Sequence, residues 1–180
     1  RDRHVKINGA SLRFKFTGKS GVKHTIDLTD RKLARIVQRC QELPGQELFQ
    51  YIDDAGQPQD VRSHDVNDYL RAISGHDFTA KDFRTWSGTL LGLQCLLHSG
   101  PCDTQAQTRH NINAAVRQVA AQLGNTPTVC RQYYIYPDIL AAYEDGTLFE
   151  MLTGLETVNV PGLETDEDIL IALLKKLESS

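Results

Sequence analysis

Apolar and polar residues alternate along the first thirty positions of the chain. The alternation runs from Val5 to Leu28 and is interrupted by turn residues at Asn8-Gly9 and Gly18–Gly21. This pattern predicts three short antiparallel strands within residues 1–28. Because successive side chains point to opposite faces of a strand, Leu12, Phe14 and Phe16 are expected on a core face, and Arg13, Lys15 and Thr17 on a basic face.

From residue 29 onward the apolar residues recur with helical spacing. The first expected helix is capped by Thr29 or Asp30, runs to about Leu43 and turns Leu33, Ile36 and Val37 inward. A loop rich in Asp, Gly and Pro follows from residue 53 to 60. The further helices are expected at residues 63–74, 80–97, 108–123, 139–143, 147–152 and 166–177, with another opening at Pro127.

These elements predict an α+β fold that is mainly helical, with a small N-terminal three-stranded antiparallel sheet. A chain of 180 residues is long enough to bury a real core and suits one domain, with residues 1–28 as the sheet and residues 29–180 as the helical part.

The segment from Leu123 to Pro137 contains a predicted corner between two helices. Gly124 can adopt the left-handed conformation that ends a helix, Thr126 can cap the next one, and Pro127 suits its first position. The corner carries one amide and three phenols, Asn125, Tyr133, Tyr134 and Tyr136. A tyrosine can be a nucleophile, although an amphipathic wall residue is the commoner role.

The net charge of −3 conceals a strong segregation of sign along the chain. Residues 1–40 hold eleven Lys or Arg and three acidic residues, whereas residues 141–180 hold two Lys or Arg and nine acidic residues. The first forty residues therefore suit a surface that binds a polyanion, the alternative being ordinary solvated charge.

The cysteines favour a reducing compartment. Four of them are scattered without any C-x-x-C pair, and the sequence has neither a signal peptide nor an apolar run of membrane length. Four possible zinc ligands lie near one loop, but their spacing matches no familiar zinc site; they are Cys95, His98, Cys102 and His110. We expect a cytoplasmic protein without a metal site.

Two short motifs could bind phosphate. G-K-S at Gly18 lacks the earlier glycine of a nucleotide-binding loop, because Arg13 stands there and a strand follows, so no nucleotide is expected. K-D-F-R-T-W places Lys81 and Arg84 one turn apart near a helix N-terminus, where backbone donors are exposed. A structural Arg84 paired with Asp77 or Asp82 is the alternative.

Taken together in order, these motifs resemble the type IB DNA topoisomerases, specifically the small bacterial and poxvirus-like branch. The resemblance covers nearly the whole chain and rests on G-K-S-G, G-Q-E-L-F-Q-Y-I-D-D, K-D-F-R-T-W, L-G-N-T-P and C-R-Q-Y-Y-I-Y-P. Each motif is weak alone, and the ordered set is specific.

The resemblance implies relaxation of supercoiled DNA through a transient 3′-phosphotyrosyl bond. In that family the nucleophile lies nine residues after the polar residue of the corner, which from Asn125 selects Tyr134. Lys19 would be the general acid, and Arg84 would hold the non-bridging phosphate oxygens. Asn125 and Lys81 complete the expected catalytic set. The expected DNA contacts are Lys15, Lys23, Arg31, Lys32, Arg35 and Arg131.

The resemblance also implies a monomer that acts on double-stranded DNA in the nucleoid and needs no cofactor, metal or nucleotide. Two departures from the family stand out. Asn125 replaces the usual histidine, so this position can donate a hydrogen bond but cannot carry a proton. The first catalytic arginine and the small N-terminal DNA-clamping domain have no counterpart in these residues, so the chain alone is expected to be poorly active.

Two other functions compete with this one. A tyrosine recombinase uses the same chemistry, but usually has histidine where this chain has Lys81. A non-catalytic DNA-binding module would use the basic first forty residues alone, and its affinity would fall steeply with salt.

Overall fold

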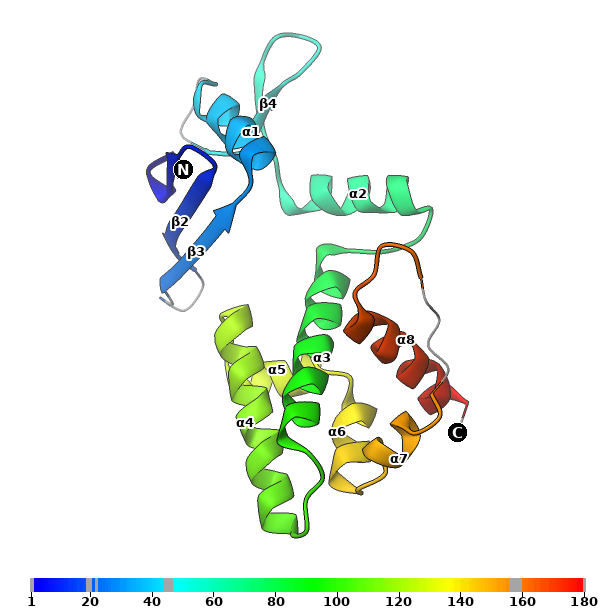
Figure 1. Ribbon diagram of the computed structural model, residues 1–180. Helices are drawn as coiled ribbons and strands as arrows, with labels where there is room; N and C mark the ends of the chain where they lie inside the picture. Colours follow the sequence, from blue (N-terminus) through cyan, green and yellow to red (C-terminus); the bar gives the residue numbers. More distant parts are fainter. Residues whose placement is uncertain (1, 19–20, 22, 44–46, 156–159, 180) are drawn as a thin grey trace. The chain divides into compact units, whose positions relative to one another are not determined.

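The structure is a computed structural model that describes residues 2–18, 21, 23–43, 47–155 and 160–179. It consists of two compact units, Arg1–Thr79 and Ala80–Ser180 (Figure 1). No helix in the described part of the chain has the length and apolar character needed to cross a membrane.

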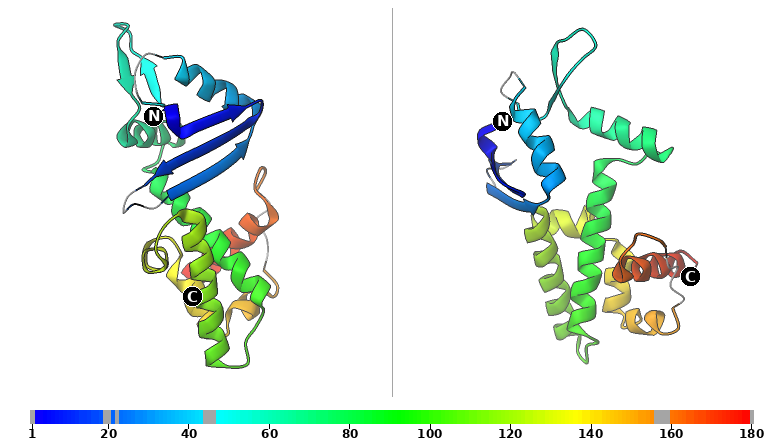
Figure 2. Two further views of the ribbon diagram at one scale, coloured as in Figure 1. Left: turned by 90° about the vertical axis from the view of Figure 1, so that its left-hand side faces the viewer. Right: turned by 45° about the horizontal axis from the view of Figure 1, so that its top comes forward.

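The first unit begins with the predicted three-stranded antiparallel sheet, in the order β1-β2-β3. Val5 pairs with Phe14 and Leu12 with Leu28. One face of the sheet is open and α1 covers the other, as Figure 2 shows. The elements are η1 (Asp2–His4), β1 (Val5–Asn8), β2 (Ser11–Thr17), β3 (Lys23–Thr29), α1 (Arg31–Gln41), β4 (Gln50–Ile52), β5 (Pro58–Asp60) and α2 (Ser63–Ser74).

Helix α1 begins as predicted, but it buries a different stripe. The Asp30 carboxylate caps it by accepting a hydrogen bond from the Leu33 amide at 2.8 Å. The predicted stripe is only partly right, because Leu33 and Ile36 remain 44% and 47% exposed. Val37 is buried as predicted, and Ala34 faces the sheet in place of Leu33 and Ile36; the small Ala34 lets the helix lie close to the sheet. The core of this unit comprises Val5, Leu12, Ala34, Val37 and Leu48.

The loop predicted at residues 53–60 is partly wrong. Strand β5 pairs with β4 there as a small antiparallel hairpin. The Asp53 carboxylate closes the turn by accepting hydrogen bonds from the Ala55 and Gln57 amides at 3.0 and 2.8 Å. The hydrogen bond from Gln57, aided by the Gln59 side chain, holds the pKa of Asp53 below its ordinary value. Three-residue strands are too short to produce a recognisable alternation.

The second unit is entirely helical in its described residues, and it contains every helix expected there. The helices are α3 (Ala80–Ser99), α4 (Gln105–Leu123), α5 (Pro127–Tyr133), α6 (Pro137–Glu144), α7 (Leu148–Leu152) and α8 (Thr165–Glu178). On α4 the residues Ile112, Val116, Val119 and Ala120 are buried, and Leu123 is half-buried. The core draws on α3 through α8, including Leu93, Leu96, Ile112, Val119, Ile139 and Leu170.

Helix α3 occupies the middle of this unit and packs against both α4 and α8. Two side-chain hydrogen bonds attach it to α8. The Trp86 indole donates to Glu167 at 2.9 Å, and the Gln94 amide donates to Asp166 at 2.7 Å. The indole bond lowers the pKa of Glu167 from its ordinary value. Acidic residues of the C-terminal segment thus help to hold α3.

A buried hydrogen-bonded cluster surrounds Tyr143, which is only 4% exposed. Its hydroxyl donates to the Gly100 carbonyl at 2.8 Å and accepts from the Asn111 amide at 2.9 Å. The Cys102 sulfur lies 3.1 Å from the same hydroxyl. Burial raises the pKa of Tyr143, so the phenol stays neutral. Cys102 therefore belongs to this cluster, and all four cysteines are free thiols.

Replacing Tyr143 by Phe should lower the free energy of unfolding by about 1 to 3 kcal/mol, because two buried groups lose their partner. Unfolding in urea, followed by a signal from the helical unit, would measure the change in free energy. Tyr133→Phe is the matched control, since the Tyr133 side chain is 51% exposed and should leave stability unaltered. Equal stability of the two variants would contradict a structural role for the cluster.

Candidate active site

The predicted corner between α4 and α5 is confirmed. Gly124 has a φ of 62° and ends α4 in the left-handed region. Its amide and the Asn125 amide both bond back to the Ala120 carbonyl. The Thr126 hydroxyl caps α5 by accepting from the Val129 amide at 3.3 Å, and Pro127 occupies the first turn. Local sequence therefore determines the direction in which α5 leaves the corner.

Helix α5 ends at the two adjacent tyrosines. The Tyr134 amide still bonds to the Cys130 carbonyl at 3.0 Å, but its φ and ψ of −128° and 0° leave the helix. The Tyr133 side chain is exposed, Tyr134 is half-buried, and Ile135 enters the core. The end of the helix thus places one phenol partly within the protein and its neighbour in solvent.

Arg84 on α3 lies against the Tyr134 ring. Its guanidinium carbon is 5.1 Å from the ring centroid, within the range of a cation–π contact. The same guanidinium donates through Nη2 to the Leu123 carbonyl at 2.8 Å. Arg84 therefore contacts both sides of the corner, the end of α4 and the end of α5.

The alternative structural role for Arg84 named Asp77 or Asp82 as its partner. Asp77 binds Arg71, at 2.6 Å. Arg84 nevertheless has a structural contact of its own in the Leu123 carbonyl. That contact orients the guanidinium and leaves other N–H donors of the same group for a ligand, because arginine carries five.

Lys81 lies one turn before Arg84 and contacts the other tyrosine. Its ammonium nitrogen is 5.7 Å from the centroid of the Tyr133 ring. Two cations on successive turns of α3 thus lie against two successive tyrosines of α5. The structure brings Lys81, Arg84 and Tyr134 together in this way, and the half-buried Asn125 belongs to the same corner.

The positive charge of Arg84 also reaches a buried thiol. Burial raises the pKa of Cys130, and Arg84 partly opposes that rise. Cys130 is one turn before Tyr134 on α5 and is completely buried. The thiol therefore stays protonated and serves as a packing residue, while the guanidinium supplies the charge of this site.

Sequence reasoning missed the residues that let α3 approach the tyrosine segment. A Cβ added to Gly88 would lie 2.3 Å from the Tyr134 carbonyl oxygen, so only glycine fits there. Glycine within a helix is costly unless the backbone needs the space. The sequence signal for this close approach was therefore the pair of glycines, Gly88 and Gly92, four residues apart within a predicted helix. The structure adds that Thr89, which lies between them, is buried.

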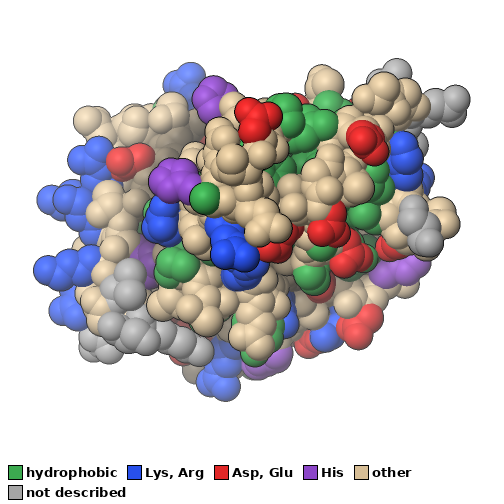
Figure 3. Space-filling view, turned by 90° about the horizontal axis from the view of Figure 1, so that it is seen from below, with side chains coloured by type: hydrophobic (Ala, Val, Ile, Leu, Met, Phe, Trp, Pro, Cys, Tyr) green, Lys and Arg blue, Asp and Glu red, His purple; other side chains and the backbone are tan. Residues whose placement is uncertain are grey.

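The basic residues of the first unit form two groups rather than the one surface considered from the sequence. The β1-β2-β3 register places the first group on the open face of the sheet, namely Lys6, Arg13, Lys15 and Lys23. The second group lies on α1, which covers the opposite face, and comprises Arg31, Lys32, Arg35 and Arg39. Blue Lys and Arg side chains gather along the left edge of the space-filling view (Figure 3).

Asp27 moderates the charge of the open sheet face. Its carboxylate accepts two hydrogen bonds from the Arg13 guanidinium, one of them 3.1 Å long. Hydrogen bonding to Arg13 lowers the pKa of Asp27. Lys19, the predicted general acid, lies outside the described residues. Arg131, the remaining predicted DNA contact, is exposed on α5 of the second unit.

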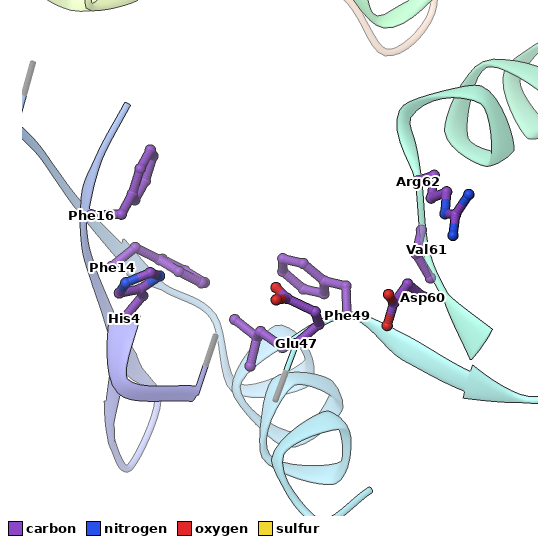
Figure 4. A pocket seen from close by; sticks show the side chains of 9 residues that line it. His4, Phe14, Phe16, Glu47, Phe49, Asp60, Val61 and Arg62 are labelled. Atoms are coloured by element: carbon purple, nitrogen blue, oxygen red, sulfur yellow. The ribbon is translucent and has the colours of Figure 1, made fainter. Parts of the chain in front are cut away.

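An open pocket of about 380 Å³ lies in the first unit, and none of the predicted site residues lines it. Figure 4 shows Phe14, Phe16 and His4 on one side of it, and Phe49 with Glu47 on another. The pocket is mainly apolar, so it does not resemble a phosphate site.

Comparisons with known proteins identify the family of this chain. A family model described as the catalytic core of eukaryotic DNA topoisomerase I matches residues 1–146. The chain belongs to the type IB DNA topoisomerase family. The DNA topoisomerase 1B of Acanthamoeba polyphaga mimivirus is 31% identical over 160 residues, covering 83% of this chain and 46% of the viral protein. This topoisomerase chain thus spans about half the length of that relative.

The family assignment made from the motifs is confirmed, and the viral relative fits the poxvirus-like branch. The matched range contains Lys81, Arg84, Asn125 and Tyr134, whereas α7 and α8 follow it.

Gly88→Ala should destabilise the protein by roughly 1 to 3 kcal/mol, since its methyl group would displace the Tyr134 backbone. Gly92→Ala is the control. Its Cβ would meet the nearest Ile135 atom at 3.5 Å, an ordinary contact, so the better helix propensity of alanine should leave stability equal or higher. Thermal melting of both variants tests the pair. A harmless Gly88→Ala would show that α3 does not approach the tyrosine segment so closely.

Proposed function

We propose that this chain is the catalytic part of an enzyme that relaxes supercoiled DNA by cutting and rejoining one strand. The observation that carries the proposal is the contact between Arg84 and the Tyr134 ring in a chain of this family. A nucleophile needs a nearby positive group to stabilise the charge that develops on the phosphate, and Arg84 is such a group.

In the proposed reaction the Tyr134 hydroxyl oxygen attacks a DNA phosphorus. A bond forms between that oxygen and phosphorus, the bond from phosphorus to the 5′ oxygen breaks, and the phenol proton passes to water. The strand then ends in a 3′-phosphotyrosyl bond and a free 5′-hydroxyl. After the duplex swivels, the 5′-hydroxyl attacks the same phosphorus and releases Tyr134.

Arg84 is proposed to bind the non-bridging phosphate oxygens. Its hydrogen bond to the Leu123 carbonyl holds the planar guanidinium in place before DNA arrives. A preorganised donor of this kind typically contributes roughly 3 to 4 kcal/mol to transition-state stabilisation. Lys81, held against the Tyr133 ring, adds a second positive charge one turn away.

Asn125 and Lys19 complete the proposed set. The Asn125 amide would donate a hydrogen bond to a phosphate oxygen without transferring a proton. Lys19 would protonate the leaving 5′ oxygen. None of these steps requires a metal, a nucleotide or another cofactor, and none requires a second copy of the chain, so we propose a monomeric enzyme acting on the nucleoid.

The proposed DNA contacts combine the two basic groups of the first unit with Arg131. Lys15 and Lys23 project from the open sheet face, and Arg31, Lys32 and Arg35 project from α1. Such contacts to backbone phosphates carry no sequence information, so they would supply salt-dependent affinity rather than choice of site.

The tyrosine recombinase is disfavoured by the family match and by Lys81, and the binding module by the approach of Arg84 to Tyr134. Experiment can distinguish both of these alternatives from the proposed function. A recombinase would join exchanged strands, whereas a binding module would leave supercoiled plasmid unchanged.

Tyr134→Phe should abolish relaxation of supercoiled plasmid by the full-length protein, because the variant lacks the attacking oxygen. The assay contains a chelator and no ATP, and agarose electrophoresis measures the topoisomers. Tyr133→Phe is the matched control and should retain relaxation, since its ring still lies under Lys81. Wild-type relaxation by Tyr134→Phe would refute the proposed nucleophile.

Lys19→Ala should slow cleavage by about 100- to 10,000-fold, as expected when a general acid is removed. A substrate with a 5′-bridging phosphorothiolate should restore most of the rate, because its sulfur leaves without a proton. Single-turnover cleavage of both substrates measures the effect.

Lys15→Ala serves as the comparison for Lys19→Ala. It removes a proposed phosphate contact, so it should affect both substrates equally. If sulfur substitution fails to rescue Lys19→Ala, Lys19 is not the acid.

A further inference from the structure

Thr89 makes a buried hydrogen bond to the chain just after the tyrosine pair. Thr89 is on α3 and is only 3% exposed, and its hydroxyl accepts a hydrogen bond from the Tyr136 amide at 3.0 Å. Tyr136 lies between the end of α5 and the start of α6, where no helix supplies an acceptor for this amide. A buried backbone N–H needs a partner, and Thr89 is that partner.

The hydrogen bond belongs to a close contact between one face of α3 and three successive residues. Gly88 leaves room for the Tyr134 carbonyl, Thr89 binds the Tyr136 amide, and Gly92 contacts the Ile135 side chain. Two of these contacts are packing contacts that tolerate small shifts. The Thr89 hydrogen bond is directional and is shorter than the one that the Thr85 hydroxyl donates to the Tyr133 carbonyl at 3.3 Å, so it helps to determine where the segment lies along α3.

Arg84 and Thr89 stand on the same helix, five residues apart. The rise of an α-helix separates them by about 7.5 Å along a rigid axis. Arg84 contacts the Tyr134 ring, and Thr89 fixes the backbone two residues beyond it. The relative position of the phenol and the guanidinium therefore depends on this hydrogen bond.

We propose that Thr89 is a positioning residue for the Tyr134 nucleophile. It touches neither the phosphate nor the attacking oxygen, and it acts by holding the 134–136 backbone against α3. The inference rests on the proposed function, in which Tyr134 is the nucleophile. A misplaced nucleophile loses rate steeply, because a shift of about 1 Å can cost on the order of a hundredfold.

The test is single-turnover cleavage of a duplex from which the fragment downstream of the cut, bearing the new 5′-hydroxyl, dissociates, with the covalent protein–DNA adduct measured over time. Thr89→Val keeps the shape of the side chain and removes the acceptor. In the full-length protein, well below the melting temperature, it should cleave at least about tenfold more slowly. Affinity for DNA should remain within about twofold, because no phosphate contact is lost.

Religation provides a second measurement that a merely structural role would not affect. Because cleavage and religation pass through the same transition state, Thr89→Val should slow both by the same factor and leave the equilibrium amount of adduct unchanged. Thr89→Ser restores the hydroxyl and should return both rates to within about threefold of the wild type, since the acceptor is present again.

Thr108→Val is the matched control. Thr108 is also a buried threonine of the helical unit, and its hydroxyl donates to the Thr104 carbonyl at 3.0 Å, apart from the tyrosine segment. This variant should lose stability without losing cleavage rate. Wild-type cleavage by folded Thr89→Val would overturn the inference, and so would failure of serine to restore the rate.

Tyr134→Phe, assayed in parallel, separates this inference from the proposed function. If Tyr134→Phe forms adduct, the proposed nucleophile is wrong and the role of Thr89 falls with it. If Tyr134→Phe forms none while Thr89→Val cleaves normally, the nucleophile stands and only the positioning role is refuted.

Discussion

The arrangement of the helical unit depends on one guanidinium. Arg84 binds the Leu123 carbonyl at the end of α4 and lies against the Tyr134 ring at the end of α5, so it joins α3 to both sides of the corner. The two contacts serve different purposes. The carbonyl uses one donor and fixes the orientation of the group, and the aromatic face places the positive charge beside the phenol without neutralising it.

Helix α3 can perform this role because its sides differ in chemistry. The side carrying Gly88 and Thr89 is small and admits the backbone of the tyrosine segment. Trp86 and Gln94 instead bind acidic residues of α8. The negatively charged C-terminal segment is thus partly structural. It braces the helix that carries Lys81 and Arg84.

The sheet unit shows how a strongly basic stretch can be divided by folding. Strand alternation sends Lys15 and Lys23 to the open face, while Arg31 and Arg35 lie on the helix that covers the other face. Asp27 neutralises part of the open face through Arg13. Net charge along the sequence therefore overstates the charge that any single surface presents to a polyanion.

Much of this structure follows from local sequence. Strand alternation, the Asp30 cap and the Gly124–Pro127 corner were predictable because each depends on neighbouring residues alone. The ordered motifs likewise identified the family. The tertiary structure alone decided that Arg84 would meet Tyr134, that Ala34 rather than Leu33 would face the sheet, and that Thr89 would bind Tyr136. Those contacts join residues that periodicity cannot relate, because they depend on how helices and sheet pack in three dimensions.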